Sequence, residues 1–528
     1  MKNITVTSHT SSFGQLLPEY APVCMLSTLV FGLLAHGFAL FTKFAIGDEA
    51  FLLFTVGATT TSGRWFLGLL GNAVSLFFGS PNFSLPLWGG LLTLVFTGLC
   101  SCVLVSWLGL VKKRSWILVS GITTVFPVMS GLFFYCFTAP YYMFGLMLVL
   151  LGGRLLCTRR RAGDFLGSVC LVCLGLSIYQ AFLPLFLSLL LIFFLKERLQ
   201  EKCRTLPELL KEIGWYCLGC LFIAAVYLLS VRLSIRLSGT ELTDYKGISN
   251  MGSASIPEYL HRIKLAIYLF LFPARADRYA FLFPYRLLPC YWLTLVGIGL
   301  LSLAPILRLF RQSIITGIAG LLVLAFFPLA VNFIYLLCAQ EDVYNLMLFG
   351  LMAPFFLLVC LTDWALPAGD RKPALVLRKA AVVLLAVFCL FCIRTDNAVY
   401  ARGNYMQERA KSYFTTMIAQ IKSTPGYTGA TPVAFVGDIY SYTDPTFRGI
   451  EGFGALSMAP LPYDSSPFSI GHSWKNFLNL WCGFSPPFAN PEDFEALPEV
   501  QAMPTYPDSG SIRMVGDTLV VKFRETAH

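Results

Sequence analysis

The sequence predicts an all-α polytopic membrane protein with about eleven transmembrane helices, followed by a small α/β domain outside the membrane. Three observations support this fold class. Of the 528 residues, 56% are apolar and only 13% are charged, whereas about one-quarter of the residues in a soluble domain are charged. Apolar runs of about 18 residues or more, long enough to cross a bilayer as a helix, recur along the chain. From about residue 395 the chain becomes polar, and no later run is long enough to span.

The first span is expected at about 21–42 and is retained, because no small-residue cleavage site follows it. The next long apolar run, 85–110, ends at a basic cluster. Between these spans, residues 43–84 are expected to form one or two helices at the outer membrane surface. Residues 115–157 have about twice the length of a span, and a second basic cluster follows them. The two clusters are Lys112, Lys113 and Arg114, and Arg159, Arg160 and Arg161.

Residues 164–196 are short for two spans and long for one. Basic residues flank them on both sides, which favours two short helices separated by a break near Tyr179, Gln180 and Pro184. The alternative, a single tilted helix, would invert the orientation of every later segment. Within this apolar run, Tyr179 and Gln180 are expected to form hydrogen bonds between helices rather than to bind a ligand.

A span at 213–232 is followed by a long loop, 233–288, and by four more apolar runs. Because short basic turns favour the cytoplasm, we expect a cytoplasmic amino terminus and an extracytoplasmic carboxyl terminus in the cell (inner or plasma) membrane. Residues 43–84 and 233–288 are then external loops of a transmembrane domain, 1–394. The four runs are 289–307, 314–338, 345–363 and 380–394.

Residues 395–528 are expected to form the extracytoplasmic α/β domain, since about 130 residues can bury a small core. The stretch 402–422 has a helical pattern. The segment PVAFVG (432–437) predicts a buried strand, and RMVGDTLVVKF (513–523) predicts a hairpin that turns at Gly516-Asp517.

The net charge of +10 is interpreted as an orientation signal, because the basic excess lies in short turns rather than on a nucleic-acid-binding surface. Most of the sixteen cysteines lie in apolar runs, where cysteine packs as a small hydrophobe. The chain has no phosphate loop, no HExxH motif and no dinucleotide fingerprint. We therefore expect no metal, no cofactor, no nucleic-acid partner and no disulfide framework in the tail.

Asp48 and Glu49 stand side by side just after the first span. Carboxylates at the mouth of a span are costly unless they are solvated or functional. A carboxylate there can act as a base toward a hydroxyl group. Nucleotide sugars and ATP are absent outside the cytoplasm, so any chemistry there would need a substrate that is delivered in the membrane, such as a lipid-linked sugar. The alternative is a solvated loop that carries two acidic residues.

The external loop 233–288 is basic, against the trend of the other external segments. Its stretch RIKLAIYLFLF (262–272) is expected to be an interfacial helix with a cationic start. Cations at headgroup depth suit a phosphate, although attraction to anionic lipid or snorkelling explains them as well. The phosphate-binding candidates are Arg262, Lys264, Arg275 and Arg278.

Three other charged residues are candidates for the same outer site. Arg64, in the sequence SGRW, is either an ion-pair partner of Asp48 or Glu49 or a donor to sugar or phosphate. Glu341 and Asp342 lie in an acidic external turn. They either contribute to the outer cavity or stabilise the amino end of the next helix.

Four stretches resemble, in the same order, the type II Gtr glucosyltransferases, membrane enzymes that decorate O-antigen and related polysaccharides. They are IGDEAFLLFTVGATTTSGRWFLGLL, LSIYQAFLPL, IKSTPGYTGATPVAFVG and YPDSGSIRMVGDTLVVKF. The resemblance implies a GT-C-like fold, an acidic motif in the first external loop and a polyprenyl-phosphate-linked sugar donor. It makes Asp48 and Glu49 that motif, with Asp48 as catalytic base and Arg64 as an active-site cation.

The expected function is therefore transfer of a sugar, glucose, from a polyprenyl phosphate to a polysaccharide or glycolipid acceptor of the cell envelope. The first alternative is a transporter or flippase of a lipid-linked saccharide. Such a protein would carry charged residues along a path through the bilayer, and few are present mid-span. The second alternative, a surface receptor in which the tail is the active part, would not need so many spans.

Overall fold

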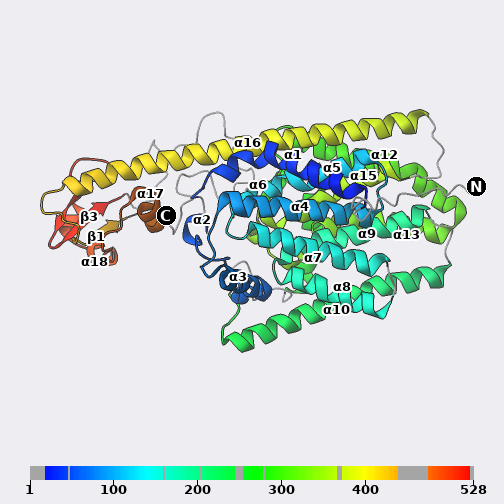
Figure 1. Cartoon of the computed structure of the whole chain (residues 1–528), viewed down its shortest axis with the longest axis horizontal. Coiled ribbons are helices and arrows are strands. Elements are labelled where there is room, and N and C mark those ends of the chain that lie inside the picture. The colour runs from blue at the N-terminus through cyan, green and yellow to red at the C-terminus, as the bar shows by residue number, and fades with distance from the viewer. Residues whose placement is uncertain are drawn as a thin grey trace, which may run out of the picture.

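The computed structural model is an elongated bundle of helices with a small sheet domain at one end (Figure 1). Helices α2 and α3 lie at the end of the bundle that faces the sheet, and helix α16 begins at the opposite end (Figure 1). The structure describes residues 18–45, 48–158, 161–200, 205–243, 254–277, 280–364, 372–437 and 474–523.

Within the described residues, seven helices are long and apolar enough to cross a membrane. The pair α5 (Lys113–Val125) and α6 (Pro127–Phe133), bent by 47°, adds an eighth if it is counted as one broken span. The multi-pass helical architecture is confirmed, whereas the count of about eleven spans stays a prediction. The seven helices are α1 (Tyr20–Phe41), α4 (Pro86–Leu108), α7 (Ala139–Thr158), α10 (Leu206–Ser238), α12 (Leu287–Gln312), α13 (Ile314–Val331) and α16 (Lys372–Ser423).

The stretch that was short for two spans forms two helices, as predicted. They are α8 (Ala162–Leu176) and α9 (Leu183–Gln200), separated by the short 3-10 helix η3 (Gln180–Phe182). Helix α8 packs closely along α7. At the contact, a Cβ added to Gly175 would lie only 2.6 Å from the carbonyl oxygen of Gly145, so only glycine fits there. Small residues at such contacts let two helix backbones approach each other.

The segment between α1 and α4 forms α2 (Asp48–Phe51), the 3-10 helix η2 (Thr60–Ser62) and α3 (Trp65–Phe78). Helix α3 runs across the bundle and is seen almost end-on in Figure 1. This orientation agrees with the interfacial helix expected there.

Helix α11 (Ile256–Leu271) is capped by the preceding residue Ser255, whose hydroxyl accepts a hydrogen bond from the backbone amide of Glu258. It packs against α13 and α14 (Ile334–Leu337). Several short elements complete this part of the chain. They are η5 (Pro273–Arg275), η7 (Gln340–Asp342), η8 (Asn345–Met347), η9 (Phe349–Met352) and α15 (Ala353–Asp363).

Helix α16 contains 52 residues, which corresponds to a length of about 78 Å. It continues without a break through residue 394, where the change in composition placed a domain boundary, and leads from the bundle to the sheet (Figure 1). The helix expected at 402–422 is its outer half. The bundle and the tail are therefore joined by a continuous helix.

The tail contains a three-stranded sheet of order β1-β3-β2, formed by β1 (Val433–Val436), β2 (Ile512–Val515) and β3 (Thr518–Lys522). The predicted strand and hairpin are confirmed: β1 is parallel to β3, and β2 is antiparallel to it. One hydrophobic core packs the sheet against α16 and α17 (Trp474–Cys482). A second hydrophobic core packs the sheet against the segment that contains α18 (Glu492–Glu495) and α19 (Pro498–Gln501).

Candidate active site

A cavity of about 160 Å³ lies at the end of the bundle that faces the sheet domain. Asp48 and Arg64, two residues singled out from the sequence, both line it. Its other walls come from the turn before α7, from the break between α8 and α9, and from α14 and the loop that follows. The polar lining includes Tyr135, Thr138, Tyr142, Tyr179, Gln180 and Tyr344.

Arg64 is held in place by contacts from two other segments. Its Nη1 donates a hydrogen bond to Tyr142 Oη at 2.9 Å, and its Nε donates one to Gln180 Oε1 at 3.4 Å. The guanidinium carbon lies 5.0 Å from the centre of the Tyr179 ring, which stacks on Tyr142 at 4.3 Å. A planar cation held by hydrogen bonds and aromatic faces keeps its charge in one position.

Gln180 links Arg64 to helix α10. Its Nε2 donates hydrogen bonds to the carbonyl oxygen of Ser62 at 2.7 Å and to Tyr227 Oη at 2.9 Å. The expected bond between helices is confirmed for Gln180, but its role beside Arg64 did not follow from the sequence. The signal that could have suggested it is a polar pair placed at a helix break within an apolar run.

Glu49 has different surroundings from its neighbour Asp48. It is 1% exposed, and its Oε1 accepts hydrogen bonds from Lys43 Nζ and Ser84 Oγ. Lys43 also donates to Ser84 at 2.7 Å. Burial raises the pKa of Glu49, and the positive charge of Lys43 opposes that shift. Glu49 therefore ties the chain after α1 to the start of α4, while Asp48 lines the cavity.

Arg262 lies beside the cavity wall. Its Nη1 donates to the carbonyl oxygen of Leu336 at 3.4 Å, and the next residue, Leu337, lines the cavity. Arg262 also forms an ion pair with Glu258, one turn earlier in α11. The guanidinium therefore fastens α11 to α14 near the site.

The remaining predicted residues are more scattered. Lys264 and Arg275 are exposed, and within the described ranges neither lines this cavity. Asp342 is half-buried in η7, between the lining residues Cys338 and Tyr344. Arg278 lies outside the described residues, and the side chain of Glu341 is not among those described.

The arrangement suits proton removal beside a fixed cation. A carboxylate can take a proton from a hydroxyl group, and a preorganised guanidinium stabilises a developing or departing anion. In the part of the chain that the structure describes, no three His, Cys, Asp or Glu side chains are grouped to hold a metal ion.

A comparison with known protein families identifies the family of this chain. A family model described as glucosyl transferase GtrII matches residues 37–355, a region that contains Asp48, Arg64 and Gln180. No curated protein and no solved structure matches the chain. Because the family model covers more than half of the chain, this protein belongs to the glucosyl transferase GtrII family, as its resemblance to type II Gtr enzymes predicted.

Proposed function

We propose that the protein moves glucose from a polyprenyl-phosphate-linked donor to a hydroxyl group of a cell-envelope polysaccharide, at the extracytoplasmic face of the cell membrane. Family membership supports glucosyl transfer. The observation that carries the residue assignment is the shared cavity of Asp48 and Arg64, a base beside a fixed cation.

The distribution of charge supports the proposed sidedness. Lys113 begins α5, Arg308 and Arg311 lie in the last turns of α12, and Lys372 begins α16. These helix ends belong to short turns, and basic short turns stay in the cytoplasm. The cavity lies toward the opposite end of the bundle, near α3 and the sheet domain, and we assign that end to the extracytoplasmic face (Figure 1).

An apolar groove beside the cavity suits the isoprenoid chain of the donor. The groove has a volume of about 640 Å³ and lies between α3, α4 and the start of α7. Its lining includes Val74, Phe78, Trp88 and Phe144, and Phe137 lines both groove and cavity. A hydrocarbon chain in this groove would place its phosphate beside Phe137, toward Arg64. Burial of apolar surface would supply the affinity.

The proposed reaction is a single displacement. Asp48 accepts the proton of the acceptor hydroxyl while the oxygen of that hydroxyl bonds to the anomeric carbon of glucose. The bond from that carbon to the phosphate oxygen breaks, and polyprenyl phosphate departs with both electrons. Arg64 balances the charge of the departing phosphate, and the anomeric configuration is inverted.

Mass analysis of envelope glycans, with and without the protein, tests the proposal. We expect one hexose to be lost without the protein, restored by the wild type and not restored by Asp48→Asn. Asp517→Asn, the same change at an exposed turn of the β2–β3 hairpin, is the matched control and should restore the hexose. Identical glycans in the presence and absence of the protein would contradict the proposal.

A further inference from the structure

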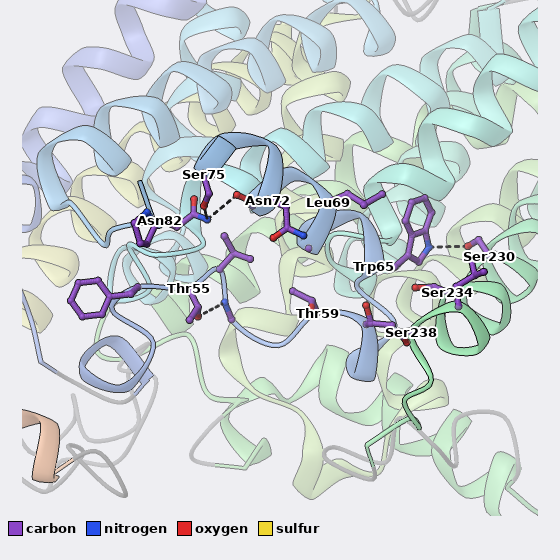
Figure 2. Close-up of a pocket in the computed structure, with 18 of the residues that line it drawn as sticks. Thr55, Thr59, Trp65, Leu69, Asn72, Ser75, Asn82, Ser230, Ser234 and Ser238 are labelled. Carbon is purple, nitrogen blue, oxygen red and sulfur yellow. Dashed lines mark hydrogen bonds between the residues drawn. The ribbon is translucent and has the colours of Figure 1, made fainter. Parts of the chain in front are cut away.

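A second groove, of about 820 Å³, adjoins the cavity, and Figure 2 shows its lining. Helix α3 forms one wall and the outer end of α10 forms the other. Val56 and Gly57 line both spaces. Gly57 has a φ of 89°, and a Cβ there would lie 3.0 Å from the Phe137 ring. Only a residue without a side chain fits this partition easily.

The lining of this groove is uncharged and combines a mostly apolar surface with hydroxyl and amide groups. Among the described residues that line it, none is acidic or basic, and hydroxyl and amide groups provide the polar surface. Ser230, Ser234 and Ser238 lie on successive turns of α10, across the groove from Asn72 of α3 (Figure 2). A groove of this kind has hydrogen-bond donors and acceptors without a charge that would select an ion.

Part of this surface is held rigidly. Asn82 donates hydrogen bonds to the carbonyl oxygen of Gly71 at 2.9 Å and to Ser75 Oγ at 2.8 Å. Trp65 Nε1 donates to Ser230 Oγ at 3.0 Å, which fixes the indole ring beside the groove (Figure 2). These contacts prepare one wall before any ligand arrives, which lowers the entropy lost on binding.

Other polar groups are available to a ligand. The side chains of Thr59, Asn72 and Ser234 line the groove, and none of them forms a hydrogen bond with a described residue. Figure 2 shows them around the same open space. They can exchange water for the hydroxyl groups of a ligand, as polar groups at binding sites commonly do.

We infer that this groove binds the acceptor saccharide through neutral sugar residues, an inference that rests on the proposed function. A saccharide offers many hydroxyl groups and apolar ring faces, which match the hydroxyl and amide lining and the fixed indole of Trp65. The volume lies within the usual range of ligand sites, about 300–1,000 Å³. A chain in the groove presents its terminal hydroxyl over Val56 and Gly57 to Asp48.

Substitutions that fill the groove test the inference. Ser234→Trp and Asn72→Trp place bulk in it. Leu229→Trp on α10 and Leu76→Trp on α3 place the same bulk on exposed positions that do not line it; those leucines are 67% and 85% exposed. The acceptor is the oligosaccharide released by mild acid from the envelope polysaccharide of cells that lack the protein. Transfer assays in proteoliposomes with polyprenyl phosphate glucose give KM for the donor and KM for the acceptor. Saturation-transfer NMR measures binding of the oligosaccharide without transfer.

The groove variants should raise KM for the acceptor about tenfold or more, with KM for the donor and slow donor hydrolysis changed less than about twofold. The control variants should match the wild type. Asn72→Ala, which adds no bulk, should raise the acceptor KM by a smaller factor and covers the case in which the tryptophan variants do not fold. NMR signals of the bound oligosaccharide should disappear in Ser234→Trp.

An unchanged acceptor KM in folded groove variants would overturn the inference while the proposed function stands. A rise in donor KM alone would overturn it too, because the groove would then belong to the donor. A third outcome separates the two ideas. If the wild type binds the oligosaccharide but transfers no glucose to it, and Ser234→Trp removes the binding, the proposed function would be contradicted. Saccharide binding at the groove would still be supported.

Discussion

The side-chain oxygen of Gln407 in α16 accepts a hydrogen bond from the backbone amide of Ala45 at 2.6 Å, across 362 positions of sequence. The amide nitrogen of Gln407 also donates to the carbonyl oxygen of Lys43 at 3.1 Å. These bonds fasten the chain just before Asp48 to the helix that carries the sheet domain. Helix α16 lies outside the region matched by the family model, so the position of the proposed base depends on a segment beyond that region.

Replacing Gln407 by leucine should therefore slow transfer. The change leaves the buried N–H of Ala45 and the half-buried C=O of Lys43 without their partner. An unpaired buried group costs about 1–3 kcal/mol, and the change also frees the segment that positions Asp48. We expect kcat to fall about 10- to 100-fold, with little change in KM for the donor. Gln420→Leu, at an exposed position of the same helix, is the control. A wild-type kcat in Gln407→Leu would show that this contact does not position the base.

Arg64→Lys should impair the reaction although it preserves the charge. Lysine lacks the planar group that bonds Tyr142 and Gln180 and lies over Tyr179. We expect kcat to fall about 100-fold, as measured by single-turnover transfer of glucose from polyprenyl phosphate glucose. Arg409→Lys, at an exposed site on α16, provides the comparison. Equal rates in both variants would remove Arg64 from the proposed chemistry.

Lys43→Met should destabilise the protein. The substitution leaves the buried carboxylate of Glu49 without its cation, and breaking a buried pair in this way costs about 3–5 kcal/mol. Adding Glu49→Gln should restore most of the loss, because the remaining group is then neutral and can still bond Ser84. Thermal unfolding in detergent measures all three proteins. Additive losses in the double variant would argue against a coupled pair.

The pH dependence of stability follows from the surroundings of Glu49. Burial raises its pKa above the ordinary value of 4.5, so the folded protein holds this proton more tightly than the unfolded chain does. The resulting stabilisation is complete below pH 4.5 and is lost as the pH rises through the folded-state pKa. The difference in unfolding temperature between the wild type and Glu49→Gln should therefore shift against the wild type as the pH is raised from 4.5. A difference that does not vary with pH would contradict the raised pKa.

The features that the sequence predicted correctly depend on local patterns. Long apolar runs predict a multi-pass helical protein because a bilayer leaves backbone polar groups no partner except each other. The break at Tyr179-Gln180 and the turn at Gly516-Asp517 are likewise encoded over a few residues, and both occur where they were expected. The short motifs, taken in order, predicted the family, because each motif is a continuous stretch of sequence that can be recognised without the structure.

The sequence by itself therefore determined the membrane architecture, the family and the choice of Asp48 and Arg64 as candidates. Only the tertiary structure decided that Asp48 faces a cavity while Glu49 is buried against Lys43 and Ser84, since adjacent residues on a short helix point in different directions. It also joined Gln407 to Ala45 and placed the serines of α10 opposite Asn72. The physical reason is that hydrophobic patterns act along the chain, whereas side-chain contacts depend on which distant elements pack together.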